Sequence, residues 1–237
     1  MPPRIAAIIP AYNESASIAH VVQEVLAVAS SSGLSITPVV VNDCSTDDTA
    51  TIINGLPCVA IHLPINLGIG GGVQTGLKYA FRNHFDFAVQ IDGDGQHPPQ
   101  YIPELLKAAE QNKWDVVIGS RFIAREGFQS TFLRRSGIQY FEWLNRFLCG
   151  ETVTDSTSGM RLMNKKTMEV MSKYYPDEYP EPEAIIIYHK NHLRFGEVPV
   201  KMNERMGGVS SINSSRAVYY MFKVTIAMIF TYFRKIK

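Results

Sequence analysis

Residues 87–99 decide how the chain folds; they read Phe-Ala-Val-Gln-Ile-Asp-Gly-Asp-Gly-Gln-His-Pro-Pro. A short apolar run ends here in two carboxylates, Asp92 and Asp94. Such a run predicts a strand buried on both faces of a sheet, and side chains two positions apart point the same way. Two hard oxygen ligands suit Mg²⁺ or Mn²⁺. An Asp-x-Asp pair alone is a weak signal, with a solvated turn as the alternative, but the strand before it and the Gly-Gln-His-Pro-Pro after it make it more specific.

On both sides of this stretch, short apolar runs alternate with helix-length segments over roughly the first 120 residues. We expect strands at 5–9, 37–42, 59–63, 87–91 and 116–118, and helices from Ile18, at about Gly72–Arg82 and at about Pro103–Gln111. This alternation predicts a parallel sheet with helices on both faces. The glycine run Gly68–Gly72 completes no dinucleotide or phosphate-loop motif, so it indicates a helix start packed closely against a crevice.

Polar clusters follow three of these strands: Pro10–Glu14, Asp43 and Asp92–Gln96. Ligands of such sheets gather beyond the carboxyl ends of the strands, so the three clusters are expected to converge on one crevice. Asp43 has two interpretations, a helix cap or a hydrogen bond to a base or ribose. The neighbouring clusters favour the second.

The pattern changes after about residue 120. We expect strands near Met160–Met163 and Phe195–Val200, and helices around 132–148, Lys166–Lys173 and Pro182–His192. The arginines of this half are Arg121, Arg134, Arg135 and Arg205. Guanidinium groups suit phosphate, and a solvated salt bridge is the alternative for one or two of them. The whole is interpreted as one domain.

The C-terminal segment 217–233 is apolar except for Lys223, Thr225 and Thr231, and basic residues flank it. At about 17 residues it is short for a membrane span, which needs roughly 20. An apolar stretch with basic ends predicts an amphipathic helix that lies in a membrane interface or docks on a membrane partner. The alternative is a final helix packed on the core of its own domain.

Composition excludes several classes of protein. The 237 residues are 46% hydrophobic and 19% charged, which argues against intrinsic disorder. A net charge of +1 argues against a surface built for nucleic acid. The three cysteines form no Cys-x-x-Cys pair and no secretory signal is recognised, so we expect a reducing, cytoplasmic location.

Seven ordered motifs together resemble the family 2 inverting glycosyltransferases, in the branch of the dolichyl-phosphate mannosyltransferases and bacterial polyprenyl-phosphate sugar transferases. They run from residue 9 to 212: Ile-Pro-Ala-Tyr-Asn-Glu (9–14), Asn-Asp-Cys-Ser-Thr-Asp (42–47), Asn-Leu-Gly-Ile-Gly (66–70), Asp-Gly-Asp-Gly-Gln-His-Pro-Pro (92–99), Gly-Ser-Arg-Phe (119–122), Asp-Ser-Thr-Ser-Gly-Met-Arg (155–161) and Glu-Arg-Met-Gly-Gly-Val-Ser-Ser-Ile (204–212). Two departures concern recognition: Asn42-Asp43-Cys44-Ser45 stands where Asp-Asp-Gly-Ser is usual, and Ser211 stands where relatives often carry Lys.

The resemblance implies an α/β GT-A fold, with a Rossmann-like, mostly parallel sheet over residues 1–212 and an amphipathic helix over 213–237. A donor half (about 1–120) and an acceptor half (about 121–212) would share the chemistry. The resemblance assigns the nucleotide to Pro10, Tyr12, Glu14 and Asp43, the donor diphosphate to Arg205, a Mg²⁺ or Mn²⁺ ion to Asp92, Asp94 and Gln96, the acceptor phosphate to Arg121 and Arg135, and a catalytic role to Asp155.

The implied reaction is transfer of a sugar from a nucleotide diphosphate sugar to polyprenyl phosphate by a peripheral protein at the cytoplasmic membrane face. A separate small membrane protein is a further candidate for the anchor, and no nucleic acid partner is expected. One alternative changes the acceptor to a saccharide hydroxyl of a lipid-linked glycan. A second alternative is a non-catalytic subunit that binds nucleotide sugars.

Overall fold

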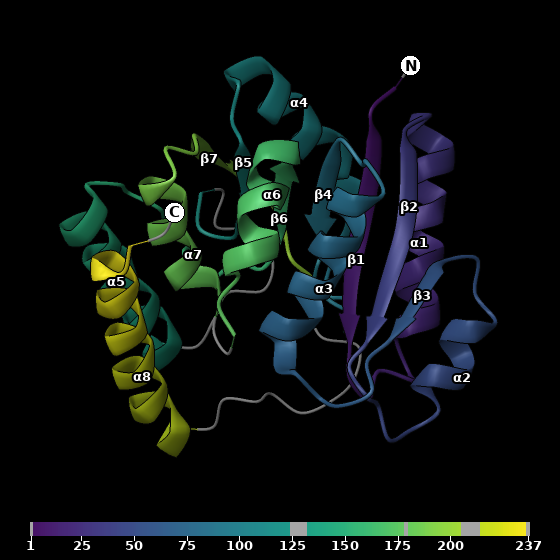
Figure 1. The fold of residues 1–237 in the computed structure, drawn as a ribbon, viewed down its shortest axis with the longest axis horizontal. Coiled ribbons are helices and arrows are strands. Elements are labelled where there is room, and N and C mark those ends of the chain that lie inside the picture. Colours follow the sequence, from purple (N-terminus) through teal and green to yellow (C-terminus); the bar gives the residue numbers. More distant parts are fainter. Residues whose placement is uncertain (1, 124–131, 178–179, 205–213, 236–237) are drawn as a thin grey trace.

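The computed structural model describes residues 2–123, 132–177, 180–204 and 214–235, and gives only the backbone for 132–136 and 214–220. These residues form a seven-stranded sheet in the order β3-β2-β1-β4-β6-β5-β7 (Figure 1). The strands are β1 (Arg4–Ala11), β2 (Ser35–Asn42), β3 (Val59–His62), β4 (Phe87–Gln90), β5 (Val116–Ser120), β6 (Arg161–Asn164) and β7 (Phe195–Pro199). The mostly parallel sheet predicted from the sequence is confirmed, with one correction: β6 runs antiparallel to both of its neighbours.

Helices cover both faces of the sheet, as expected (Figure 1). They are α1 (Ile18–Ser32), α2 (Thr49–Asn54), α3 (Gly68–Arg82), α4 (Ile102–Asn112), α5 (Phe132–Cys149), α6 (Lys165–Tyr174), α7 (Pro180–Lys190) and α8 (Ser214–Phe233). One core holds α1 and α4 against the sheet, and a second core holds α3, α6 and α7 against the opposite face.

Strand β1 lies inside the sheet, between β2 and β4, and its burial shows why this segment forms a strand. Its side chains alternate between the two cores: Ile5 and Ile9 pack with α1, whereas Ala6 and Ile8 pack with α3. Each of these side chains is fully buried. A continuous run of small and β-branched residues fits a strand covered on both faces, which is the burial predicted for this segment.

The glycine run belongs to the helix itself, because α3 begins at Gly68 and not at Gly72. A Cβ atom on Gly70 would lie 2.0 Å from the carbonyl oxygen of Asp177, and the Gly70 N–H donates to that oxygen. A Cβ atom on Gly76 would lie 2.3 Å from Ile8. The close packing inferred from these glycines is therefore confirmed, whereas the predicted start of the helix was four residues late.

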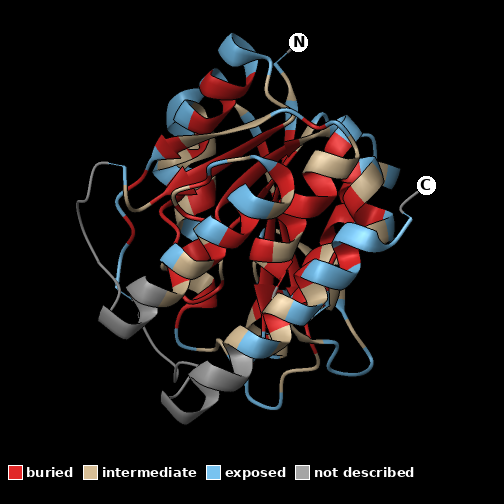
Figure 2. Cartoon of the chain, turned by 90° about the vertical axis from the view of Figure 1, so that its left-hand side faces the viewer, coloured by how far each residue is buried: buried red, intermediate tan, exposed pale blue. Residues whose placement is uncertain are grey.

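Helix α8 packs on the domain along one face and turns aromatic side chains outward along another. Val224 and Met228 are buried in a small core with α5 and α7. The opposite side exposes Phe222, Phe230 and Phe233, each more than two thirds accessible. Figure 2 shows exposed positions (pale blue) beside buried ones (red) along this helix, which leads to the C-terminus. Within the described ranges, none of the helices combines the length and the apolar character needed to cross a membrane. The two interpretations of this segment, a core helix and an interface helix, are therefore compatible.

Polar contacts fix the carboxyl end of α8 to α7. The Lys190 ammonium group donates to the carbonyl oxygens of Thr231 (2.9 Å), Tyr232 (2.6 Å) and Arg234. The Glu183 carboxylate accepts the hydroxyl of Thr231 at 2.5 Å. A cation that bonds the last carbonyls of a helix satisfies groups that have no partner inside the helix.

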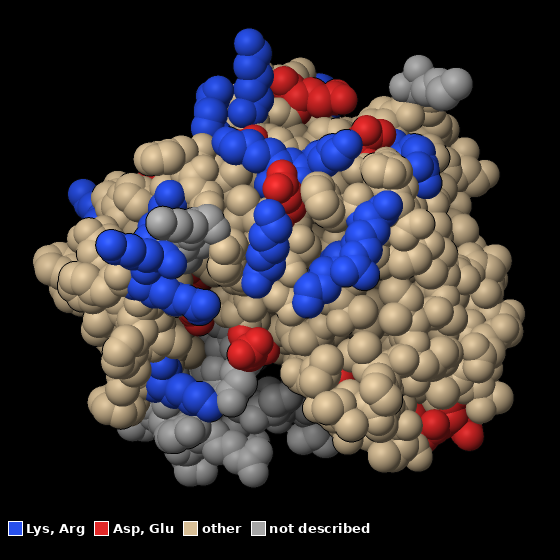
Figure 3. Space-filling view, in the orientation of Figure 1, with Lys and Arg blue, Asp and Glu red and all other residues tan. Residues whose placement is uncertain are grey.

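Lysine and arginine side chains gather over α3, α6 and α8 on the face drawn in Figure 3, with acidic groups among them. On α6, Lys173 pairs with Glu169 at 3.1 Å, and Lys166 pairs with Asp115 at 3.4 Å. Exposed pairs of this kind contribute about 0–1 kcal/mol each. This face therefore carries mixed surface charge and not a continuous basic stripe.

Candidate active site

The carboxyl ends of parallel strands meet at one edge of the sheet, and the predicted site residues lie there (Figure 1). Pro10 is near the end of β1, Asp43 follows β2, Asp92 follows β4 and Arg121 follows β5. The loop after β4 touches the end of β1, because a Cβ atom on Gly93 would lie 2.9 Å from the Pro10 carbonyl oxygen. The predicted convergence of three clusters is present.

The loops after β1 and β2 are joined by hydrogen bonds between side chains and backbone. The Asn13 N–H donates to Ser45 Oγ at 3.0 Å, and the Thr46 N–H donates to Asn13 Oδ1 at 2.8 Å. Asn13 and Cys44 both adopt left-handed backbone conformations, with φ near 57°. Tyr12 stands beside these turns and is about half exposed. The two loops thus form one platform with an accessible ring.

Glu14 lies on the inner side of this platform. Its Oε2 accepts the Ser17 hydroxyl at 2.8 Å, and its Cγ is the side-chain atom that a Cβ on Gly93 would meet at 3.5 Å. Glu14 is therefore at the junction of the loop after β1 and the Asp-x-Asp loop after β4.

Asp43 does not cap a helix. The residue at the N-cap of α2 is Asp48, and Asp43 is buried with its Oδ1 accepting the Leu67 N–H at 2.7 Å. Its carbonyl oxygen accepts a bond from Asn66 at 3.1 Å. Asp43 therefore joins the end of β2 to the start of α3.

The departure at Asn42 is accommodated inside the protein. Its amide nitrogen lies 3.0 Å from His62 Nδ1, and its Oδ1 accepts the Ser45 N–H. Because the amide donates to Nδ1, the His62 proton is on Nε2, which faces Asn54 Oδ1 at 3.1 Å. Asn42 is buried, and its side chain links the end of β2 to the end of β3.

Asp92 and Asp94 lie together in the turn after β4. Asp94 is buried and accepts the Gln96 N–H at 2.9 Å, whereas the Asp92 side chain is 31% exposed. No three His, Cys, Asp or Glu side chains of the described residues stand close enough to hold a metal ion by themselves. Mg²⁺ usually takes one or two carboxylates and completes its shell with phosphate oxygens and water. The donor set fits that mode of binding.

Arg121 and Asp155 form a bidentate ion pair. Arg121 Nε lies 2.7 Å from Asp155 Oδ2, and Nη2 lies 2.6 Å from Oδ1. The Arg121 N–H and the Thr157 hydroxyl also donate to this carboxylate. Asp155 is fully buried; although burial opposes the charged guanidinium, the bonds and charge of Asp155 outweigh it and raise the pKa of Arg121. Asp155 therefore fixes Arg121 in place.

A second carboxylate supports this pair from β7. Glu197 accepts the Thr154 N–H at 2.7 Å, the Thr154 hydroxyl at 3.0 Å and the Asp155 N–H at 2.9 Å. Burial raises the pKa of Glu197, and these three bonds act against that rise. The loop that carries Asp155 is thus held by a half-buried acid that the sequence alone did not indicate.

Arg161 is another residue beside the site that the sequence alone did not single out, although it closes the motif at 155–161. It is buried and donates to the carbonyl oxygens of Ser158, Ser156 and Glu181 at 2.8–2.9 Å. It therefore fastens the Asp155 loop to the first turn of α7. Burial also raises the pKa of the Glu181 carboxyl to about 7.

Two predicted site residues cannot be placed by their side chains. Arg135 belongs to α5, where only its backbone is described, and Arg205 lies outside the described residues. Ser211 lies outside them as well.

Several solved structures share this architecture. Glucosyl-3-phosphoglycerate synthase from Mycobacterium tuberculosis, crystallised with phosphoglyceric acid, matches with a TM-score of 0.72 at 18% identity, over 97% of this chain and 80% of that one. A complex of the same enzyme with Mn²⁺, UDP and glucosyl-3-phosphoglycerate matches at 0.70, also at 18% identity, over 97% and 80%. The fold is GT-A.

The chain belongs to glycosyl transferase family 2, whose sequence model matches residues 6–171. A UDP-N-acetylglucosamine–dolichyl-phosphate N-acetylglucosaminyltransferase from Methanococcus voltae is 33% identical over 214 residues, or 82% of this chain and 83% of the relative. A polyprenol monophosphomannose synthase from Mycolicibacterium smegmatis is 28% identical over 93% and 85% of the two chains. The protein is therefore a family 2 glycosyltransferase, as the motifs predicted.

Proposed function

We propose that the protein is a metal-dependent inverting glycosyltransferase that moves a sugar from a nucleotide diphosphate sugar to polyprenyl phosphate at the cytoplasmic membrane face. The observation that carries this proposal is that the partly exposed Asp92 carboxylate and the Arg121–Asp155 pair follow β4 and β5 at the same edge of the sheet, close enough for the charge of Asp92 to act on Arg121. Relatives named as dolichyl-phosphate and polyprenol transferases support the acceptor.

On the donor side, Pro10, Tyr12, Glu14 and Asp43 would hold the nucleotide, and Arg205 would contact the diphosphate. Asp92 and Asp94, with Gln96, would hold Mg²⁺ or Mn²⁺, and structural neighbours crystallised with these ions and UDP support that assignment. When bound, the cation would neutralise charge on the departing diphosphate.

On the acceptor side, Arg121 and Arg135 would face the phosphate of the lipid. A phosphate is already anionic, so its attack on the sugar needs positioning more than it needs a base. Among the described residues, the bonds that reach the Asp155 carboxylate come from Arg121 and Thr157. Asp155 therefore suits the positioning of Arg121 better than it suits proton removal.

The alternative acceptor, a saccharide hydroxyl, would require a base, and Glu181 is the residue that favours it. Its carboxyl has a pKa of about 7, because burial opposes the charged form, and the charge of Asp92 acts on it. Glu181→Gln should nearly abolish transfer to a hydroxyl, whereas transfer to a phosphate should fall only a few-fold.

The membrane assignment uses the outer face of the C-terminal region. The rings of Trp143 and Phe147 in α5 are stacked with their centroids 5.7 Å apart, and both side chains are exposed. Phe222, Phe230 and Phe233 of α8 are exposed as well. Exposed aromatic groups beside basic residues are typical of helices that lie in the headgroup region. A small membrane protein that covers this face is the other way in which the domain would be held at the membrane.

The test supplies purified protein with Mn²⁺ and UDP-N-acetylglucosamine, UDP-glucose or GDP-mannose, with and without polyprenyl phosphate in vesicles. We expect one donor to release its nucleotide diphosphate at least tenfold faster when the lipid is present, and chelation by EDTA to stop the reaction. Asp92→Asn should lose activity, whereas Asp86→Asn, at the other end of β4, should retain it. If EDTA has no effect, or if no donor responds to the lipid, the proposal is wrong.

A further inference from the structure

A buried chain of hydrogen bonds stands behind Asp92. The Tyr175 hydroxyl donates to Gln90 Oε1 at 3.1 Å, and Gln90 Nε2 donates to Asp92 Oδ1 at 3.3 Å. Gln90 is the last residue of β4, and Tyr175 follows α6. Both side chains are buried, so water does not compete for these bonds.

In this chain of hydrogen bonds, the donor and the acceptor of each bond are fixed. A carboxylate only accepts hydrogen bonds, so the group of Gln90 that faces Asp92 must be its NH₂. The amide oxygen then faces Tyr175, and the phenol must donate. Burial raises the pKa of Tyr175 well above its ordinary value, which keeps the phenol protonated. Each member of the chain therefore sets the orientation of the next.

His97 and Gly159 lie beside this arrangement and are compatible with it. The Asp92 N–H donates to His97 Nδ1 at 3.1 Å, so Nδ1 carries no proton and its 3.5 Å approach to Asp92 Oδ1 is not an ion pair. A Cβ atom on Gly159 would lie 2.9 Å from Gln90 Nε2 and 3.0 Å from His97 Cε1. Gln90 thus supplies the side-chain bond to Asp92 Oδ1, and the glycine provides the space for it.

We propose that Gln90 and Tyr175 are positioning residues that turn Asp92 Oδ1 inward and present Oδ2 to a divalent cation in the crevice. None of the bonds from the described residues to Asp92 ends on Oδ2. The proposal rests on the proposed function, since it assigns the ion to this carboxylate. Groups that orient a metal ligand in this way typically change metal affinity 10–100-fold when they are removed.

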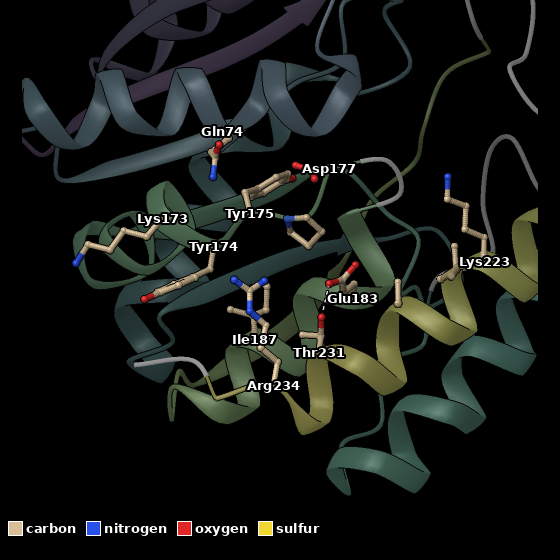
Figure 4. Close-up of a pocket in the computed structure, with 13 residues that line it drawn as sticks. Gln74, Lys173, Tyr174, Tyr175, Asp177, Glu183, Ile187, Lys223, Thr231 and Arg234 are labelled. Atoms are coloured by element: carbon tan, nitrogen blue, oxygen red, sulfur yellow. Dashed lines mark hydrogen bonds between the residues drawn. The ribbon is translucent and has the colours of Figure 1, made fainter.

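The surroundings of Tyr175 dictate the substitution. Tyr175 also lines a cavity of about 420 Å³ between α3, α6, α7 and α8, together with Tyr174, Asp177 and Glu183 (Figure 4). Truncation to alanine would enlarge this cavity and destabilise the core for reasons unrelated to Asp92. Phenylalanine removes the hydroxyl alone and keeps the ring.

The experiment measures Mn²⁺ binding by electron paramagnetic resonance, with UDP and separately with GDP, so that no turnover is involved. Tyr175→Phe and Gln90→Met should each weaken Mn²⁺ binding about tenfold. Affinity for the nucleotide without metal should stay unchanged. Because Tyr175 acts through Gln90, the double variant should bind Mn²⁺ no more weakly than Gln90→Met alone.

Tyr188→Phe is the matched control. Tyr188 is buried and its hydroxyl contacts Arg161 at 3.4 Å, but within the described part of the chain no hydrogen bond links it to Asp92. This control should lower the melting temperature about as much as Tyr175→Phe, with Mn²⁺ affinity unchanged. Wild-type Mn²⁺ affinity in Tyr175→Phe and Gln90→Met would overturn the positioning role and leave the proposed function intact. A wild-type protein that binds no Mn²⁺ would overturn both.

Discussion

The two sides of the crevice are held together by different chemistry. Between the loops after β1 and β2, neutral side chains near the surface, such as Asn13 and Ser45, accept bonds from backbone N–H groups. On the side of β5, a buried carboxylate holds a guanidinium, and a second, half-buried carboxylate, Glu197, holds the loop beneath it. Removing one neutral partner near water costs little, whereas removing one member of a buried ion pair leaves a charge without compensation. The β5 side should therefore be much the more sensitive to single substitutions.

The largest effect is expected at Asp155. Asp155→Ala removes the carboxylate that pairs with the largely buried Arg121 and should lower the free energy of unfolding by about 3 kcal/mol, measured by urea denaturation. The double variant Asp155→Leu with Arg121→Met should recover most of that loss while remaining inactive, because it removes both charges. An Asp155→Ala protein as stable as the wild type would contradict the contrast between the two sides.

An intermediate effect is expected from Glu181, as a dependence on pH. Its carboxyl has a pKa of about 7 in the folded protein and about 4.5 when unfolded, so the folded state binds more protons between these values. Stability from this group is therefore complete below pH 4.5 and is lost as the pH rises to 7, by on the order of 2 kcal/mol. Urea titrations at pH 5 and pH 8 should show the difference in the wild type and a smaller one in Glu181→Gln. If the free energy of unfolding changes equally between pH 5 and pH 8 in the two proteins, the raised pKa does not belong to Glu181.

The smallest effect is expected at Asp47, on the β2 side. Although burial acts in the opposite direction, bonds from Thr49 and Ser15 lower the pKa of this exposed carboxyl to about 2. Its contribution is present above pH 3.8 and is lost as the pH falls toward 2. Because solvent screens the group, Asp47→Asn should cost less than about 1 kcal/mol at pH 7. A loss as large as that of Asp155→Ala would remove the distinction between the two sides.

The sequence predicted the strands of the first half well because each is a short apolar run, and all but the edge strand β3 are largely buried on both faces. The Asp92–Asp94 pair and its place at the end of β4 follow from the same pattern. The orientation of β6 was not predictable in this way, because Arg161–Asn164 is only four residues long and its direction depends on partners in β4 and β5. A local pattern reports which face is buried and not which strand lies beside it.

The partners of the site residues were also beyond local patterns. Asp155 stands 34 positions from Arg121, and Tyr175 stands 85 positions from Gln90. Spacing along the chain carries no information on such pairs, so an Asp with a family-assigned role was found but its ion pair was not. Glu197 and Arg161 were overlooked because a single charged residue in an apolar stretch gives no signal of its own.

The bonds from Lys190 and Glu183 to the end of α8 also have a mechanical consequence. They prevent the last helix from swinging on its own, so it moves with α7, whose first turn is fastened by Arg161 to the loop that carries Asp155. The surface that the outward aromatic rings contact therefore sets both the distance and the orientation of the active site relative to that surface.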